Sequence, residues 1–378
     1  MISEKSPVNN QSRTAARKAP EQCLFSLLIV TCSLLIFSCI TQTPQSKTAP
    51  LWLTALEKAY PSREWVAVTA EGTSQPQAEA QAMNALARAF RTDITSLIQA
   101  SQKYSEIVDK AANNKNITFN ENKNFSQEVN THTSIKGLIG VQVDIYRAAD
   151  RAIHVNARMN RAECAARYSG IIRENAAIIN TLLASAASKP QASFDAYALY
   201  SYAHSIAQIT DNFQSILEVL DAQAVNRKPN YGTADAVKAK MLDCAALITI
   251  GIDITTEQPA DKTLITRAAA SFFSDLGFKT NEQNSPGTPG AAIYTLRANA
   301  RFETITQSVI SCRYYLDAAL VNRNGTASFA YTEDDRKAHP DTASEARRLA
   351  LRAVETSFKE GRFANEFNSW LFKISNEQ

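Results

Sequence analysis

Few residues of this sequence combine the types and the spacing that catalysis or metal binding requires. No Gly-X-Ser-X-Gly elbow presents a serine nucleophile, and no CxxC pair or Cys/His cluster offers a zinc site. The adjacent carboxylates Glu333, Asp334 and Asp335 could bind Ca²⁺, but no glycine-bearing metal loop accompanies them, so we interpret them as a solvated turn after a strand. The four histidines are interpreted as packed or surface residues: His132, His154 and His204 in regular elements, and His339 in a loop before Pro340. The sequence therefore predicts no catalytic residue, no bound cofactor and no metal ligand.

One cysteine stands where the surrounding sequence predicts its chemistry. Residues 24–40 form an apolar stretch, and the segment before it carries four basic side chains against two acidic ones. The stretch closes on Ile36-Phe37-Ser38-Cys39.

These residues resemble a bacterial lipobox, and Phe37, where a small residue is commonest, makes the match closer to the looser boxes of spirochaete lipoproteins. The resemblance implies that the Cys39 thiol is linked to diacylglycerol and becomes the first residue of the mature chain. Residues 1–38 would then be a signal peptide.

The alternative is a transmembrane helix that is never cleaved. About 17 apolar residues is near the lower limit for crossing a hydrocarbon core of ~30 Å. Cleavage is favoured by the polar Thr31, Ser33 and Ser38 and by the missing basic flank after Ile40. Two or three acyl chains on Cys39 would hold the chain stably at a membrane, where a single chain would not.

Composition excludes one large class of partner. The chain has 378 residues, of which 45% are hydrophobic and 20% charged, so its length predicts two domains with substantial cores. Removal of residues 1–38 takes away four basic and two acidic side chains and lowers the net charge from +3 to +1. A nucleic-acid-binding protein needs a concentrated basic face, so no nucleic-acid partner is predicted.

The mature chain keeps three cysteines besides Cys39, at positions 164, 244 and 312. If one pair is bridged in an oxidising periplasm, Cys244 and Cys312 form it, because both fall in the later half of the chain. The favoured alternative is that all three are small buried side chains.

The first part of the mature chain reads as a tether followed by an α+β module. Residues 39–50 are polar and proline-containing, which is typical of a tether. A strand is predicted over 64–73 and an amphipathic helix over 74–108, opened by a Ser74/Gln77 capping box with Pro76 near the first helical position. A polar loop (112–124) and three strands follow, at 125–135, 140–146 and 152–160, with a tight turn at Asp150-Arg151 between the last two.

A family resemblance covers residues 50–168. It consists of Pro50 and Trp52, Tyr60-Pro61, a hydrophobic strand, and the run EGTS followed by the alanine-rich AEAQAMNALARAF. These features resemble the LPP20-type bacterial lipoprotein family, although Ala70 stands where that family often has glycine. The resemblance implies an envelope lipoprotein with a small α+β module, related to periplasmic flagellar T-ring proteins, and it brings no catalytic residue.

Two long helices are predicted next. Residues 161–187 carry an apolar seam with four-three spacing, and a second seam follows Lys189-Pro190. The first is Cys164, Tyr168, Ile171, Asn175, Ile178 and Leu182; the second is Leu199, Tyr202, Ile206, Ile209, Phe213, Ile216 and Leu220. The short connection predicts an antiparallel hairpin. Its seams either pack on each other and on the first sheet, which is favoured, or dock a partner helix or a second copy. Asn175 could set the register, but a half-exposed position is the simpler interpretation.

A second module follows a predicted linker. Alternating isoleucines predict a strand over 246–254, and a helix over 263–276 ends at Gly277 with Phe278 packing back. A flexible loop (284–290) and three strands come next, at 292–302, 309–322 and 326–332, the last two joined by an Asn324-Gly325 hairpin turn. A final helix opens at a Thr342/Glu345 capping box and is bent or broken at Gly361. The start of this module resembles the curli-secretion lipoprotein and the penicillin-binding-protein activators.

The sequence thus predicts an α+β protein of two βαβββα modules with mainly antiparallel sheets, joined by a helical hairpin. The expected divisions are 1–38 signal peptide, 39–50 tether, 51–187 first module, 188–226 long helix of the hairpin, 227–241 linker and 242–378 second module.

The expected function is a non-enzymatic binding or assembly protein of the bacterial envelope, anchored by lipid on Cys39, on the outer rather than the inner membrane. A protein partner is expected, and an oligomer could form through the hairpin. The alternatives are an envelope hydrolase whose site is assembled from dispersed residues, such as Glu333, Asp334 and a histidine, and a carrier of an apolar ligand.

Overall fold

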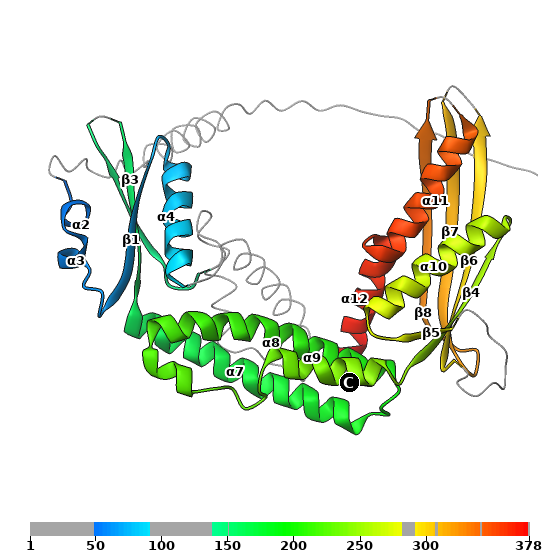
Figure 1. Cartoon of the computed structure of the whole chain (residues 1–378), viewed down its shortest axis with the longest axis horizontal. Helices are drawn as coiled ribbons and strands as arrows, with labels where there is room; N and C mark the ends of the chain where they lie inside the picture. The colour runs from blue at the N-terminus through cyan, green and yellow to red at the C-terminus, as the bar shows by residue number, and fades with distance from the viewer. Residues whose placement is uncertain are drawn as a thin grey trace, which may run out of the picture. The chain divides into compact units, whose positions relative to one another are not determined.

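The computed structural model describes six stretches of the chain: residues 49–90, 138–149, 151–281, 292–306, 309–340 and 342–376. Contacts divide the chain into two units, residues 1–48 and 49–378, and the described elements all belong to the second. Cys39, the signal peptide, His132, Asp150, the predicted helix beyond residue 90 and the predictions over 112–124, 125–135 and 284–290 lie outside the described residues. The described elements confirm the α+β class: helices pack on two sheets with mostly antiparallel strands (Figure 1).

The first sheet has the strand order β1-β3-β2, with both pairs antiparallel. Its strands are β1 (Trp65–Gly72), β2 (Gln142–Arg147) and β3 (Ile153–Asn160). Helix α4 (Gln75–Ala89) covers one face, where Leu86 packs near Val66 and Val155 in one apolar cluster. This confirms the predicted strand, helix and following strands within the described residues, since period-2 and period-3.6 apolar patterns bury one face each.

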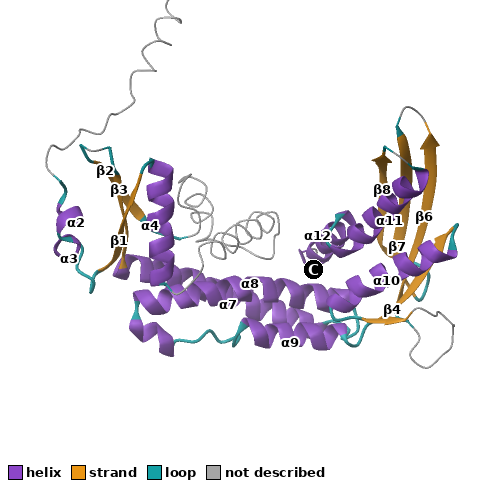
Figure 2. Cartoon of the chain, turned by 45° about the horizontal axis from the view of Figure 1, so that its top comes forward, coloured by secondary structure: helices purple, strands orange, loops and turns teal. Residues whose placement is uncertain are grey.

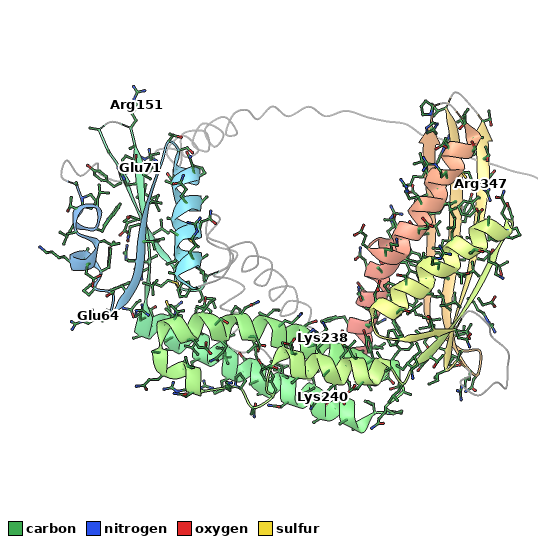
Figure 3. The ribbon with its side chains drawn as sticks, viewed as in Figure 1. Glu64, Glu71, Arg151, Lys238, Lys240 and Arg347 are labelled. Carbon is green, nitrogen blue, oxygen red and sulfur yellow. The ribbon has the colours of Figure 1, made fainter. Side chains whose placement is uncertain are left out.

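Of two local predictions for this module, the structure confirms the turn and contradicts the Ser74 cap. Arg151 has φ 73° in the turn that joins β2 and β3, where the Ala148 amide donates to the Ala152 carbonyl at 2.9 Å, so the predicted tight turn is confirmed (Figure 3). The Ser74 side chain, however, makes no capping hydrogen bond to α4. Gln77 instead accepts from the amide and the hydroxyl of Thr73, at 3.2 and 2.8 Å. The short helices α2 (Leu51–Thr54) and α3 (Leu56–Ala59) were not predicted.

The helical hairpin is confirmed. Helix α7 (Arg161–Ser188) and helix α8 (Phe194–Leu220) lie side by side, and every residue of both predicted seams is buried (Figure 2). Asn175 is fully buried and not half-exposed, because its side-chain amide donates to the Thr210 hydroxyl at 3.0 Å inside the hairpin. In the described part of the chain, no helix is both long and apolar enough to cross a membrane.

Regular structure begins earlier than predicted after the hairpin. A 3-10 turn η1 (Ala222–Asn226) follows α8, and helix α9 (Ala234–Ala245) starts within the residues predicted as a linker. Asp211 on α8 fixes this start, since its carboxylate accepts from the Tyr231 hydroxyl at 3.0 Å and from the Ala234 amide at 2.9 Å. A carboxylate at a helix N-terminus also interacts favourably with the helix dipole.

The second sheet has the strand order β5-β4-β6-β7-β8. Its strands are β4 (Thr249–Thr256), β5 (Lys279–Asn281), β6 (Tyr294–Thr306), β7 (Ile310–Asn322) and β8 (Ala327–His339). β4 is parallel to β5 and β6, whereas β6-β7 and β7-β8 are antiparallel. The short β5 was not predicted, and β6 and β8 run further than predicted.

Helices cover one face of this sheet (Figure 1). They are α10 (Pro259–Asp275), α11 (Ala343–Lys359) and α12 (Arg362–Asn376). Gly277 has φ 91° after α10, and the Phe278 amide donates to the Phe273 carbonyl at 3.0 Å, which is the predicted glycine stop. The break at Gly361 is also confirmed, and a Cβ there would lie 2.6 Å from the Ser357 Cα.

The prediction of a solvated turn at Glu333–Asp335 is wrong. All three residues lie within β8, paired with residues 314–316 of β7, and His339 ends the same strand and not a loop. Glu333 is buried, and its carboxylate accepts from the hydroxyls of Tyr314 (2.8 Å), Tyr331 (2.6 Å) and Ser357 (2.5 Å). Burial and the Glu333 carboxylate together raise the pKa values of both tyrosines.

This network joins β8 to the break between α11 and α12. The Ser357 hydroxyl donates to Glu333 and also accepts from the Phe363 amide at 3.1 Å, at the start of α12. A buried carboxylate needs such donors because an unsatisfied buried charge is costly.

We therefore expect Ser357→Ala to lower the free energy of unfolding of the second module by about 1–3 kcal/mol, the usual cost of leaving buried polar groups unpaired. Trp370 fluorescence in a chain carrying Trp52→Phe and Trp65→Phe would report urea unfolding, because Trp370 packs on Phe329 and Phe367 of this module. Ser369→Ala, at an exposed site on α12, is the matched control, and equal midpoints for the two variants would contradict the role of the network.

Candidate docking groove

Residues 51–60 attach to the face of the first sheet that α4 leaves open. Trp52 on α2 is buried, and α2 contacts β3. The Arg158 guanidinium lies 4.6 Å from the centre of the Tyr60 ring and pairs with Asp144, which also accepts from the Tyr60 hydroxyl at 3.1 Å. Burial raises the pKa of Tyr60, with Arg158 opposing the rise.

An open groove of about 580 Å³ lies where the hairpin meets the start of β1. Helix α7 provides a floor of small side chains, Ala162, Ala165, Ala166 and Ser169. Leu217 and Leu220 of α8 provide apolar lining, and Ala222 of η1 also lines the groove. The four α7 residues follow i, i+3, i+4, i+7 spacing, so they share one helix face.

The end of the groove is held in place by Arg161. Its Nε donates to the Ser62 carbonyl at 2.8 Å, and its guanidinium also donates to the Val219 carbonyl near the end of α8. The Arg161 amide donates to the Glu64 carbonyl at 2.8 Å, at the end of β1 nearest the hairpin (Figure 3). The bond to Val219 satisfies a carbonyl group at the C-terminus of α8. The donor is a cation, which is the charge that interacts favourably with this end of a helix.

Charged side chains stand on the rim of the groove. Arg63, 83% exposed, lies 3.1 Å from Glu64, and Arg227, 63% exposed, lies 3.6 Å from Asp221. Exposed ion pairs of this kind contribute only about 0–1 kcal/mol, because water screens them and the side chains lose entropy. Both guanidinium groups can therefore exchange their present partners for a carboxylate on another molecule at little cost.

A shallower hollow of about 320 Å³ lies on the second sheet. Ala319 and Ala330 are among the residues that line it, and Arg297, Asp253 and Asp317 stand at its rim. Each of these five residues is on the side of its strand opposite the buried apolar positions, as in a sheet with one solvated face.

The sequence-based candidates are not brought together in the described structure. His154 Nδ1 lies 3.7 Å from Glu71, and His204 Nδ1 lies 3.1 Å from the Ala234 carbonyl, while the hydrogen bonds to Glu333 come from hydroxyl groups. Asp334 is bound by Arg313 at 2.5 Å, which lowers the pKa of this exposed carboxyl. No group of histidine, cysteine and acidic residues suited to a metal ion occurs among the described residues.

The groove was missed by the sequence analysis, which considered only the apolar seam of α7. Cys164 and Tyr168 of that seam are buried, so a partner cannot reach them while the hairpin is closed. The available signal was the second stripe at 162, 165, 166 and 169, where small residues occupy a face that carries neither long charged nor large apolar side chains.

No protein-family model matches the chain, and no curated protein matches it. Among solved structures it is similar to a secreted protein of Helicobacter pylori, with 9% identity over 78% of this chain and 97% of that chain, and a TM-score of 0.34. It is also similar to a minor lipoprotein of Acinetobacter baumannii, with 11% identity over 32% of this chain and 92% of that chain, and a TM-score of 0.23. A lipoprotein of Neisseria meningitidis gives 13% identity over 30% of this chain and 98% of that chain, and a TM-score of 0.22. Likeness at this level assigns the chain to no family, and the LPP20-type resemblance stays a prediction.

Cys164, Cys244 and Cys312 are buried and none of them forms a disulfide, so the favoured prediction of three buried thiols is confirmed and there is no Cys244–Cys312 bridge. Burial raises the pKa of Cys244 to about 11 and also raises that of Cys312. Because only the thiolate is a good nucleophile, both thiols should be inert at neutral pH.

In the detergent-solubilised chain at pH 8, we expect iodoacetamide to modify Cys244 slowly while the protein is folded. Unfolding returns the pKa of the thiol to about 8.5 and should allow rapid modification. Peptide mass spectrometry reads each cysteine separately, and Ser369→Cys supplies an exposed thiol as the control. Failure of Cys244 and Cys312 to react in urea without reductant would show a disulfide and contradict the free thiols.

Proposed function

We propose that this chain is a lipid-anchored protein of the bacterial envelope that binds another protein and performs no chemistry of its own. The observation that carries the proposal is the Ile36-Phe37-Ser38-Cys39 sequence at the end of an apolar stretch of signal-peptide length. Acylation of Cys39 would leave residues 39–50 as a tether of at most ~40 Å when extended. The first described element, α2, would then follow this tether directly, and α2 contacts β3.

The contacts of the acidic residues support a binding protein over a hydrolase. Glu333 accepts hydrogen bonds from three hydroxyl groups, Asp144 forms an ion pair with Arg158, and Asp261 forms an ion pair with Arg347 at 2.6 Å. A general acid or base must reach a substrate proton within hydrogen-bonding distance, directly or through one water. These carboxylates instead tie one element of the fold to another, which leaves the exposed rim of the groove as the surface best suited to function.

The lipid and the two module resemblances suggest a membrane and a type of assembly for this protein. The lipid would place the chain at the outer rather than the inner membrane, and the two module resemblances point to flagellar, secretion or peptidoglycan-synthesis assemblies. A docking protein in any of these settings needs a stable anchor and an exposed binding surface. Two or more acyl chains supply the stable anchor, because each buried CH₂ group contributes roughly 0.8 kcal/mol of membrane-binding free energy.

The anchor is tested by growing cells with an alkyne-bearing fatty acid and comparing the wild-type chain with Cys39→Ala. We expect Cys39→Ala to lose both the fatty-acid label and the membrane fractionation, because the thiol is the site of attachment. Cys32→Ala is the matched control, since it removes a thiol from the same apolar stretch and should keep the label. Membrane fractionation of an unlabelled Cys39→Ala chain would show instead that the apolar stretch is retained as a helix.

A further inference from the structure

We propose that the last two turns of α12, residues 370–376, form a strap that opens from α8 while the rest of the second module stays folded. In the closed state the strap covers an apolar surface of the hairpin around Tyr202, which packs on Phe372. In the open state this surface and the apolar face of the strap are exposed to solvent. The strap is thus a conformational device that depends neither on the groove nor on the lipid anchor.

The first turns of α12 are held firmly in the second module. The Phe363 amide donates to the Ser357 hydroxyl at 3.1 Å, and the rings of Phe363 and Phe367 are fully buried. Phe367 packs on Phe272 and Phe273 of α10, with ring centres 5.4 and 5.5 Å apart. Aromatic rings bury a large apolar area, so these turns should leave the sheet only when the core of the module unfolds.

The last two turns of α12 lie along α8 and are held less firmly. Trp370 packs on Phe194 at the start of α8, with ring centres 5.4 Å apart, and Phe372 packs edge to face on Tyr202 at 5.0 Å. Both strap rings are only half-buried, in contrast to the fully buried rings of the first turns. A segment with partly exposed contacts needs less free energy to open locally than the core around it.

The hydroxyl of Tyr202 makes closure of the strap costly. Tyr202 is 4% exposed, and its hydroxyl has no hydrogen-bond partner among the residues that the structure describes. Burial raises the pKa of this phenol. The other buried tyrosines all have a hydrogen-bond partner for their hydroxyl: Tyr168, Tyr197, Tyr231, Tyr314 and Tyr331.

This unpaired hydroxyl explains why the strap can open separately. A buried polar group that lacks a partner has lost its hydration without gaining a hydrogen bond, which opposes the buried state. Because the edge of one ring meets the other, removal of Phe372 from Tyr202 uncovers the phenol and returns its hydroxyl to water. The closed strap is therefore less stable than its apolar contacts alone would make it.

Opening can be measured by thiol labelling of the full, detergent-solubilised chain carrying Ser375→Cys. Ser375 is 3% exposed and lies one turn after Phe372, so a thiol there reacts only when the strap opens. Cys312 is completely buried in the same module and serves as the internal reference for unfolding of its core. With N-ethylmaleimide and peptide mass spectrometry, we expect the introduced thiol to react about tenfold faster than Cys312, or more, because local opening costs less than unfolding.

Removal of the Tyr202 hydroxyl tests the cost of closure. Tyr202→Phe keeps the ring, so we expect labelling of the Ser375→Cys thiol to slow by about 5–30-fold, the effect of removing an unpaired buried group. Tyr197→Phe on the same helix is the matched control: its hydroxyl donates to the Leu276 carbonyl, so its loss should not slow labelling. Phe372→Ala removes the ring from the contact and should speed labelling by about tenfold or more.

Three results would overturn the inference. Equal labelling rates for the Ser375→Cys thiol and Cys312 would show that the strap opens only when the module unfolds. Labelling as fast as that of the exposed Ser369→Cys would show that residues 370–376 are not closed on α8. An unchanged or faster rate in Tyr202→Phe would show that the hydroxyl has a partner and does not oppose closure. Each of these results would leave the proposed anchor and docking function as they stand.

Discussion

The fold depends on one helix that belongs to two hydrophobic cores. At the start of α8, the Phe194 ring packs on Phe278 (5.3 Å), Tyr294 (4.6 Å) and Trp370 (5.4 Å) of the second module, and the Tyr197 hydroxyl donates to the Leu276 carbonyl at 3.2 Å. From Leu199 onward the same helix fills the core of the hairpin and first module. A helix cannot be divided without losing its internal hydrogen bonds, so α8 holds the two cores together.

Much of the fold could be predicted because its signals are local. The isoleucines at 250, 252 and 254 needed only period-2 alternation, and Gly277 and Gly361 needed only the backbone geometry of a helix end. Glu333 was misplaced because three consecutive carboxylates have low strand propensity. Cross-strand partners override that propensity, since Tyr314 satisfies Glu333 and Arg313 satisfies Asp334 on the adjacent strand. Such partners lie about twenty residues away and cannot be read from a local window.

The candidate sites differ in the same way, because one has a local signal in the sequence and the other depends on long-range contacts. Cys39 is proposed from sequence alone, because the Ile36-Phe37-Ser38-Cys39 pattern is contiguous and follows an apolar stretch. The groove could not be predicted, because it is formed by residues from β1, α7, α8 and η1 that only the fold brings together. The only local signal of the groove is the stripe of small residues on α7. That stripe indicates a groove only once the fold is known to place Leu217 and Arg227 beside it. A surface assembled from separate elements therefore leaves a weaker signal in sequence than a contiguous motif does.

Buried and exposed charged residues have different roles in this chain. Arg347 lies over the Phe302 ring at 4.8 Å and pairs with Asp261, so it ties α11 to α10 and the sheet in a place that water hardly reaches. A buried pair of this sort adds little net stability, because desolvation offsets the attraction, but it penalises any packing that separates its members. Arg63 and Arg227 are the reverse case: their pairs are exposed, weak and easily exchanged. The buried ion pair fixes how the elements of the fold meet. The exposed arginines beside the groove are held only by weak ion pairs and can exchange them for other contacts.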